Sequence, residues 1–145
     1  MDKAIGDYLD ALNIDLIVLA GYMKILTNPF TQRFAGKILN IHPSLLPKYP
    51  GIHTYQRALE NGDSEHGTTV HFVNEEIDGG AIVLQAKVPI FPGDTVEEIE
   101  LRTREQEYLI YPLVIKWFVE DRLKLIENQA YLDGKPLPPN GYANE

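Results

Sequence analysis

Short apolar segments alternate with polar turns along most of the chain, and they predict alternating strands and helices. Residues 16–20 form a continuous apolar run, which is typical of a parallel strand covered on both faces. Apolar positions at helical spacing over residues 5–12 predict a helix before it. Further strands are expected at residues 37–42, 68–73 and 82–90, with helices at 29–34 and 54–61. The order strand, helix, strand predicts a right-handed parallel crossover and an α/β fold with a mostly parallel, doubly wound sheet.

The C-terminal third carries the signals of one long helix. Thr95 and Glu98 form a capping box, from which the helix is expected to run through Phe118. Pro112 lies inside this helix and is expected to kink or interrupt it. Residues 123–126 and 130–132 predict a terminal hairpin, and the proline-rich tail after Lys135 is expected to be irregular.

Composition limits the classes of function. The 145 residues are expected to form a single domain over 1–145. A net charge of −8 argues against nucleic acid as a partner. No stretch approaches the roughly 20 apolar residues that span a bilayer, so no membrane role is expected. The chain contains no cysteine, which excludes disulfides and thiolate metal sites. A secretory signal is not evident, and a cytoplasmic location is expected.

Candidate chemistry is concentrated in the segment Asn-Ile-His-Pro-Ser-Leu-Leu-Pro at residues 40–47. Asn40 and His42 are two residues apart, so on a strand their side chains leave from the same face. In α/β sheets, active loops lie beyond the carboxyl ends of the strands, where both residues fall. Histidine titrates near neutrality and can act as an acid, while an amide can donate to a developing oxyanion. Taken alone, His42 would more often be an ordinary surface or core histidine, and Asn40 an asparagine that caps the backbone at the end of a strand.

Asp78 is the third candidate, and it precedes Gly79 and Gly80. A carboxylate close to an imidazole orients the ring and favours its protonated form. Asp-Gly is also a common turn signal, which is the plainer interpretation of this residue alone. Ser44 is adjacent to His42 in an extended segment, so the two side chains diverge and Ser44 is expected to be structural.

The chain resembles the phosphoribosylglycinamide formyltransferases, the folate-dependent glycinamide ribonucleotide transformylases. The resemblance extends from Asp-Leu-Ile-Val-Leu-Ala-Gly-Tyr-Met at 15–23, through the Asn-x-His-Pro-Ser-Leu-Leu-Pro segment, to Pro-Pro-Asn-Gly-Tyr at 138–142. It implies formyl transfer from 10-formyltetrahydrofolate to the amine of glycinamide ribonucleotide in de novo purine biosynthesis. Asn40 and protonated His42 would stabilise the oxyanion, with Asp78 keeping His42 protonated and relaying a proton.

The same resemblance implies binding roles for further residues. The folate site would involve Met23, Lys24, Ile25, Leu26, Asn40, Asn74, Ile77 and Asp78. Lys24 stands where the family commonly has arginine, so the planar fork is lost. Pro43, Arg104 and Glu107 would contact glycinamide ribonucleotide, although an ion pair in solvent is the plainer interpretation of two charges three residues apart on a helix. No cluster of metal ligands is apparent, and no metal is predicted.

One departure from the family pattern accompanies this match. Family members begin with a strand and a glycine-rich loop that holds the substrate phosphate, and this sequence has no counterpart of either. We therefore expect a formyltransferase fold without its N-terminal strands, as a fragment, a mis-started frame or part of a split enzyme. The strand at 16–20 could then self-associate or pair with an N-terminal fragment. Formyltetrahydrofolate deformylase and a non-catalytic folate-binding subunit are the alternative functions.

Overall fold

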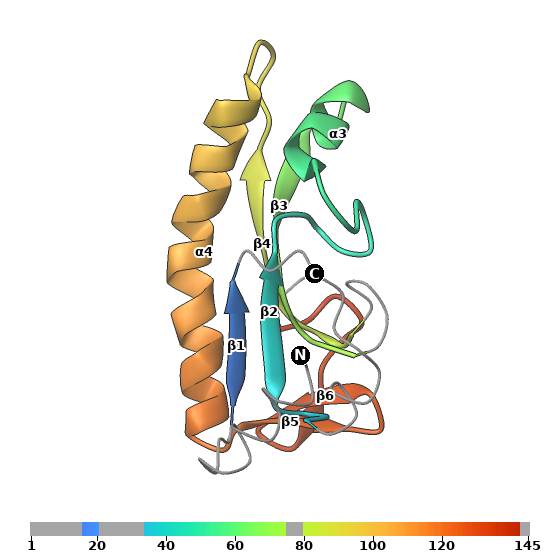
Figure 1. Cartoon of the computed structure of the whole chain (residues 1–145), viewed down its shortest axis with the longest axis vertical. Coiled ribbons are helices and arrows are strands. Elements are labelled where there is room, and N and C mark those ends of the chain that lie inside the picture. The colour runs from blue at the N-terminus through green and yellow to red at the C-terminus, as the bar shows by residue number, and fades with distance from the viewer. Residues whose placement is uncertain (1–15, 21–33, 75–79, 143–145) are drawn as a thin grey trace, which may run out of the picture.

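The computed structural model describes residues 16–20, 34–74 and 80–142. They form an α/β arrangement whose main sheet has the strand order β1-β2-β3-β4 (Figure 1). Its strands are β1 (Ile17–Ala20), β2 (Ile38–His42), β3 (Glu65–Phe72) and β4 (Ile82–Pro89), with the short helix α3 (Thr54–Glu60) between β2 and β3. The strands predicted at 16–20, 37–42, 68–73 and 82–90 are thereby confirmed, with β3 beginning three residues earlier than predicted. The helix predicted at 5–12 lies outside the described residues, as does the one predicted at 29–34 except for its last residue, Phe34.

The described sheet is mixed. β1 and β2 are parallel, as the predicted crossover requires, and residues 21–33 of their connection lie outside the described residues. The β2–β3 and β3–β4 pairs are antiparallel. The connection from Phe72 to Ile82 is shorter than the dozen or more residues that a parallel crossover needs, which explains the reversal at β4. β1 is also less covered than predicted, because Val18 is 42% exposed.

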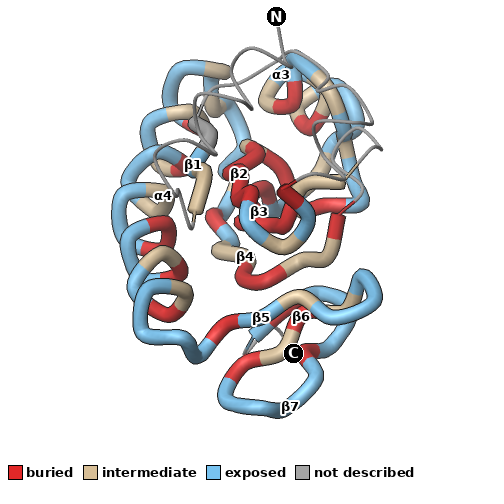
Figure 2. The backbone as a smooth tube through the Cα atoms, turned by 60° about the horizontal axis from the view of Figure 1, so that its bottom comes forward, coloured by how far each residue is buried: buried red, intermediate tan, exposed pale blue. Residues whose placement is uncertain are grey.

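Burial is greatest in the two central strands. Every residue of β2 is buried, as is β3 after its first residue (Figure 2). Leu39 and Ile41 belong to the main core with Val114 and Trp117 of the long helix α4 (Val96–Val119). Asn40 and His42 alternate with these apolar residues along β2, and they therefore leave from the face turned away from α4.

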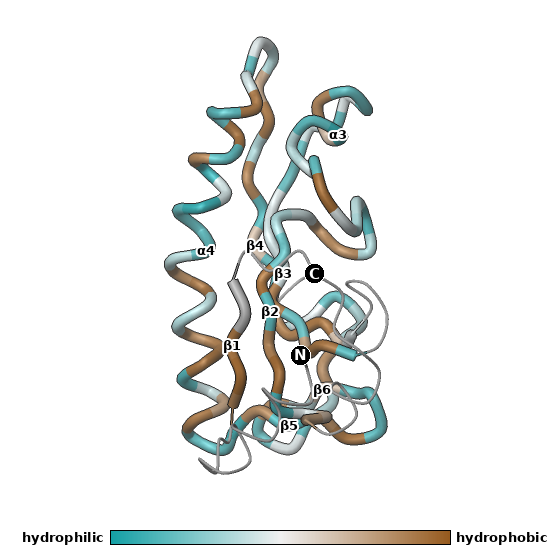
Figure 3. The backbone as a smooth tube through the Cα atoms, viewed as in Figure 1, coloured by the Kyte–Doolittle hydropathy of each residue, from teal (hydrophilic) through white to brown (hydrophobic). Residues whose placement is uncertain are grey.

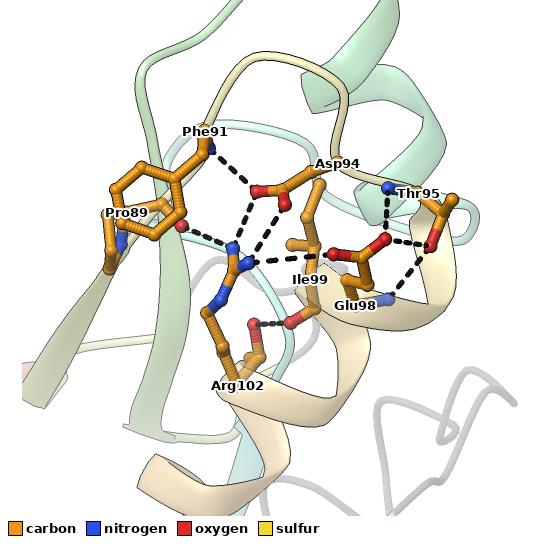
Figure 4. A network of polar contacts seen from close by, with 8 residues as sticks. Pro89, Phe91, Asp94, Thr95, Glu98, Ile99 and Arg102 are labelled. Atoms are coloured by element: carbon orange, nitrogen blue, oxygen red, sulfur yellow. Dashed lines mark hydrogen bonds and ion pairs between the residues drawn. The ribbon is translucent and has the colours of Figure 1, made fainter.

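The helix α4 begins at the predicted capping box. The Thr95 side chain accepts from the Glu98 backbone N–H, and the Glu98 carboxylate accepts from the Thr95 N–H. Arg102, one turn further on, makes paired contacts of 2.6 and 2.8 Å with Asp94 and donates to the Pro89 carbonyl at 2.9 Å (Figure 4). The guanidinium also lies 4.9 Å from the centre of the Phe91 ring. The β4–α4 turn is thus fastened to the first turns of the helix.

Pro112 does not interrupt α4, which continues to Val119. The proline is exposed, so the carbonyl that it leaves without an intrahelical donor is on the side of the helix where water can bind it. The N-terminal half of the helix is mainly hydrophilic, and the C-terminal half is more hydrophobic (Figure 3). The prediction of an interruption was wrong because it ignored this orientation.

The chain then forms a second, three-stranded sheet. The predicted hairpin is confirmed as β5 (Leu123–Ile126) and β6 (Gln129–Leu132). The tail is not wholly irregular as predicted, because Lys135–Pro136 form a short strand β7 beside β6. Further along, Tyr142 packs edge-on against Trp117 of α4, with ring centres 5.3 Å apart. Within the described ranges, no helix has the length and apolar character to cross a bilayer.

Candidate active site at the end of β2

His42 is the last residue of β2 and is only 4% exposed. Its backbone carbonyl accepts from the Ser44 N–H at 2.9 Å and from the Thr68 hydroxyl at 3.0 Å. Its ring Nε2 lies 2.8 Å from the carbonyl oxygen of Tyr49. Because a carbonyl only accepts, Nε2 carries a hydrogen in this contact. Both the backbone and the ring of His42 are therefore held in place.

Asn40 is 8% exposed and lies opposite His71 in the antiparallel register. Its amide oxygen Oδ1 is buried and makes no hydrogen bond to the described residues. An unsatisfied buried acceptor costs about 1–3 kcal/mol, so such an atom is expected to meet a donor when a ligand is bound. The Asn40 amide oxygen can therefore accept a hydrogen bond from a ligand, at a position two residues from the buried imidazole of His42.

The segment after His42 is fastened by hydrogen bonds to its carbonyls. The Pro43 carbonyl accepts from the Thr54 hydroxyl at 2.5 Å and from Nε2 of His66 at 2.7 Å. The Ser44 hydroxyl donates to the Lys48 carbonyl at 2.5 Å, in agreement with the structural role predicted for Ser44. Burial lowers the pKa of His66, which favours the neutral imidazole at neutral pH. The segment thus has a defined path over the end of β2.

Glu107 reaches the same end of the sheet from α4. Its carboxylate oxygen Oε1 lies 3.4 Å from the Thr68 hydroxyl, which also contacts the His42 carbonyl. Burial raises the pKa of Glu107, with a smaller opposing effect of the Thr68 hydrogen bond. Arg104 instead forms an exposed pair with Glu100 at 3.2 Å. The structure brings Glu107 to the site and leaves Arg104 on the outer side.

Some of the predicted site residues lie within the described ranges, and others do not. Asn40, His42 and Pro43 lie at the end of β2, and Glu107 is linked to the His42 backbone carbonyl through the Thr68 hydroxyl. Asn74 is half-buried just after β3. Several predicted residues lie outside the described ranges, namely Met23, Lys24, Ile25, Leu26, Ile77 and Asp78. Gly80 is described, and a Cβ there would lie 1.7 Å from the Phe72 carbonyl oxygen. Close approach to β3 therefore requires this glycine.

Sequence reasoning did not identify the contacts that Tyr49, Thr68 and His66 make at this site. Their contacts to the His42 ring, the His42 carbonyl and the Pro43 carbonyl join residues 7, 26 and 23 positions apart. The tyrosine belongs to the Tyr-Pro-Gly sequence that follows the motif, which was the only available signal. No group of three or more potential metal ligands occurs in the described part of the chain.

An amide and an imidazole are groups suited to bind an acyl oxygen, and comparisons with known proteins point to acyl transfer as well. A model of the family "Formyl transferase" matches residues 1–115. A phosphoribosylglycinamide formyltransferase of Haemophilus influenzae is 80% identical over 145 residues, covering 100% of this chain and 68% of the relative. One from Escherichia coli is 58% identical over 142 residues, covering 98% and 67%.

The solved structures agree with these relatives. A phosphoribosylglycinamide formyltransferase structure from Coxiella burnetii has a TM-score of 0.93 and 43% identity, covering 97% of this chain and 66% of that one. The chain thus spans about two thirds of the length of the relatives that it matches. It belongs to the formyl transferase family and, within it, to the phosphoribosylglycinamide formyltransferases, which are one-carbon transferases.

Proposed function

We propose that the chain transfers a formyl group from 10-formyltetrahydrofolate to the amine of glycinamide ribonucleotide, a step of de novo purine biosynthesis. The observation that carries the proposal is the pair of buried polar side chains at the end of β2. Asn40 has an amide oxygen without a partner among the described residues, and His42, two residues further along the same strand, has its ring held by the Tyr49 carbonyl. The 80% identity to a named enzyme of this activity supports the same assignment.

The chemistry requires no covalent bond to the protein. The substrate amine attacks the formyl carbon, a new C–N bond forms, and the carbonyl oxygen becomes negative. The Asn40 amide N–H and protonated His42 stabilise that oxygen as hydrogen-bond donors. The bond between carbon and the folate nitrogen then breaks, His42 gives a proton to that nitrogen, and the amine proton leaves by way of Asp78. One proton is lost and one is gained, so the transfer is balanced.

The unpartnered oxygen of Asn40 has a use in this scheme. A carboxamide offers an N–H donor and a carbonyl acceptor, so one side chain can face both the formyl oxygen and the attacking amine. The amine N–H would satisfy Oδ1 and orient the nitrogen lone pair toward the formyl carbon. Orientation of this kind contributes strongly to bimolecular reactions because it is fixed before the reaction begins.

Substrate contacts are proposed on either side of this pair. Glu107, already supported by Thr68, and Pro43 would contact glycinamide ribonucleotide, with Arg104 supplying positive charge nearby. The folate would be bound by Asn40 and Asp78 together with Met23, Lys24, Ile25, Leu26, Asn74 and Ile77. The partners are thus two small molecules, and no metal takes part in the scheme.

The test is a formyl-transfer assay on the purified chain, following the absorbance change of a 10-formylfolate donor with and without glycinamide ribonucleotide. We expect turnover only when the nucleotide is present. Formyl release that does not depend on the nucleotide would overturn the proposal in favour of a deformylase. Folate binding without turnover in either condition would overturn it in favour of a folate-binding subunit.

A further inference from the structure

Tyr49 contacts the His42 ring through its backbone. Its carbonyl oxygen accepts from Nε2 of His42 at 2.8 Å, and the same oxygen lies 3.3 Å from the Ser44 hydroxyl. The contact places a hydrogen on Nε2 and fixes the plane of the imidazole. The direction of this carbonyl is therefore one contact that sets how the His42 ring is held at the end of β2.

The backbone of Tyr49 does not adopt this conformation by preference. Its φ is 51°, in the left-handed region that residues other than glycine seldom occupy. Such a conformation costs of order 1–3 kcal/mol and persists only where the surroundings enforce it. At Tyr49 both the backbone carbonyl and the side chain make contacts that can hold this conformation.

The Tyr49 side chain is anchored at its far end by Asp63. Its hydroxyl donates to Oδ2 of Asp63 at 2.5 Å, and the guanidinium of Arg57 lies 5.1 Å from the ring centre. The other carboxylate oxygen of Asp63 accepts from the Asn61 side chain at 3.0 Å, and the Asp63 N–H donates to the Ala58 carbonyl at 3.1 Å. The anchor is therefore tied to the end of α3.

From this chain of contacts we infer that Tyr49 and Asp63 are positioning residues for His42, acting through the Tyr49 carbonyl. The inference rests on the proposed catalytic role of His42. Without the anchor, the left-handed segment relaxes, the carbonyl turns away from Nε2, and the imidazole loses its fixed orientation. Neither residue contacts the reacting atoms in this account, so both are expected to change turnover only through the orientation of His42.

The charge states of the pair support a constant geometry through neutral pH. The hydrogen bond to Asp63, followed by burial, raises the pKa of the Tyr49 hydroxyl, which remains a donor. Burial opposes ionisation of Asp63, but the hydrogen bonds from Tyr49 and Asn61 together with nearby charges, Lys48 among them, lower the pKa of this carboxyl. The donor and acceptor roles are therefore constant across the range in which histidine titrates.

The first test observes the His42 ring directly and needs no turnover. The full chain with ¹⁵N-labelled histidine is compared by long-range ¹H–¹⁵N correlation with the variants Tyr49→Phe and Asp63→Ala, His42 being assigned by its loss in His42→Ala. In the unmodified chain we expect the ring ¹⁵N chemical shifts of His42 to be those of an imidazole with its hydrogen on Nε2. In both variants we expect these shifts to move toward the average of the two tautomers. Asp63→Asn keeps an acceptor for the Tyr49 hydroxyl and is expected to retain most of the original spectrum.

The second test measures catalysis and folding in the same variants. Because displacement of a catalytic group by about 1 Å can reduce the rate by about 100-fold, we expect kcat to fall about 10- to 100-fold in Tyr49→Phe while KM for both substrates changes little. Tyr108→Phe is the matched control, because Tyr108 is 74% exposed on α4. Unchanged His42 spectra in folded Tyr49→Phe and Asp63→Ala would overturn the inference. If the unmodified chain lacks turnover, the proposed function fails, while the spectra still decide the role of Tyr49.

Discussion

Two polar networks in this molecule differ in one respect that separates structural from functional groups. At the start of α4, Arg102 and Asp94 meet with matched charges, and each group has an opposite partner (Figure 4). At the end of β2, the groups are more deeply buried, most acceptors are backbone carbonyls, and the amide oxygen of Asn40 has no partner among the described residues. The first network is complete without a ligand, and the second is not.

The electrostatics of the two networks differ in the same way. Hydrogen bonds from Arg102 and the Phe91 N–H hold the pKa of Asp94 well below its ordinary range. Burial instead raises the pKa of Glu107. One carboxylate is stabilised by its surroundings, and the other is destabilised by them. A fold that retains a destabilised carboxylate and an unsatisfied buried amide is expected to use both in binding.

The largest predicted effect is that of His42→Ala on turnover. Loss of a general acid typically costs about 10²- to 10⁴-fold in rate, so we expect kcat to fall by that factor with folate affinity largely retained. Steady-state kinetics and a folate-binding titration measure the two quantities. Arg102→Met is the matched control from the completed network and is expected to leave kcat unchanged. Normal turnover in His42→Ala would exclude a catalytic role for the imidazole.

Asn40→Leu is predicted to separate activity from stability. Removing an oxyanion donor lowers kcat by about 10²- to 10³-fold. The substitution also removes an unsatisfied buried acceptor and replaces it with an apolar side chain of similar size, so the melting temperature is expected to hold or rise. Thermal unfolding beside the kinetic assay tests both parts. A marked drop in melting temperature would mean that the amide is satisfied within the folded protein.

Glu107→Gln is predicted to weaken substrate binding while stabilising the fold near neutral pH. The pKa of Glu107 is higher in the folded than in the unfolded state. Well below the unfolded pKa the carboxyl is protonated in both states and costs no stability, whereas it destabilises the fold as pH rises from the unfolded pKa through the folded pKa. The variant should therefore melt higher than the unmodified chain at pH 7, and the difference should vanish at pH 3. KM for glycinamide ribonucleotide should rise. If Glu107→Gln melted at a lower temperature than the unmodified chain at pH 7, the claim that this buried charge destabilises the fold would be wrong.

Asp94→Asn is predicted to have the smallest effect on catalysis and the opposite pH dependence of stability. A carboxyl whose folded pKa is depressed stabilises the fold above its unfolded pKa, and this contribution is lost as pH falls toward the folded pKa. We expect a lower melting temperature than the unmodified chain at pH 7, a smaller difference in acid, and unchanged kcat. If the difference in melting temperature between Asp94→Asn and the unmodified chain were the same at every pH, the lost pairing with Arg102 would not be its cause.

Local signals in the sequence predicted the elements well. The capping box at Thr95 and Glu98 and the apolar strand at 38–42 depend on residues close together in the chain, and both are confirmed. The antiparallel pairing of β2 with β3, and the continuation of α4 through Pro112, depend on tertiary packing and could not be seen in local pattern.

The candidate site was predictable only in part, for the same reason. Asn40 and His42 stand out because their spacing places them on one face of a strand. The contacts of His42 with Thr68 and Tyr49 depend on how β3 and the following loop fold back over β2. The partial burial of Glu107 and the exposure of Arg104 likewise depend on how α4 packs on the sheet, since both lie on one helix only three residues apart.

The central claim is that the incomplete network at the end of β2 is where the formyl donor binds. The most direct measurement is a titration of the ¹⁵N-labelled chain with a non-reactive 10-formylfolate analogue, followed through the side-chain amide of Asn40, the ring of His42 and the guanidinium of Arg102. The account predicts saturable shifts at Asn40 and His42, with Arg102 unaffected. Saturable binding that leaves Asn40 and His42 unchanged would contradict it.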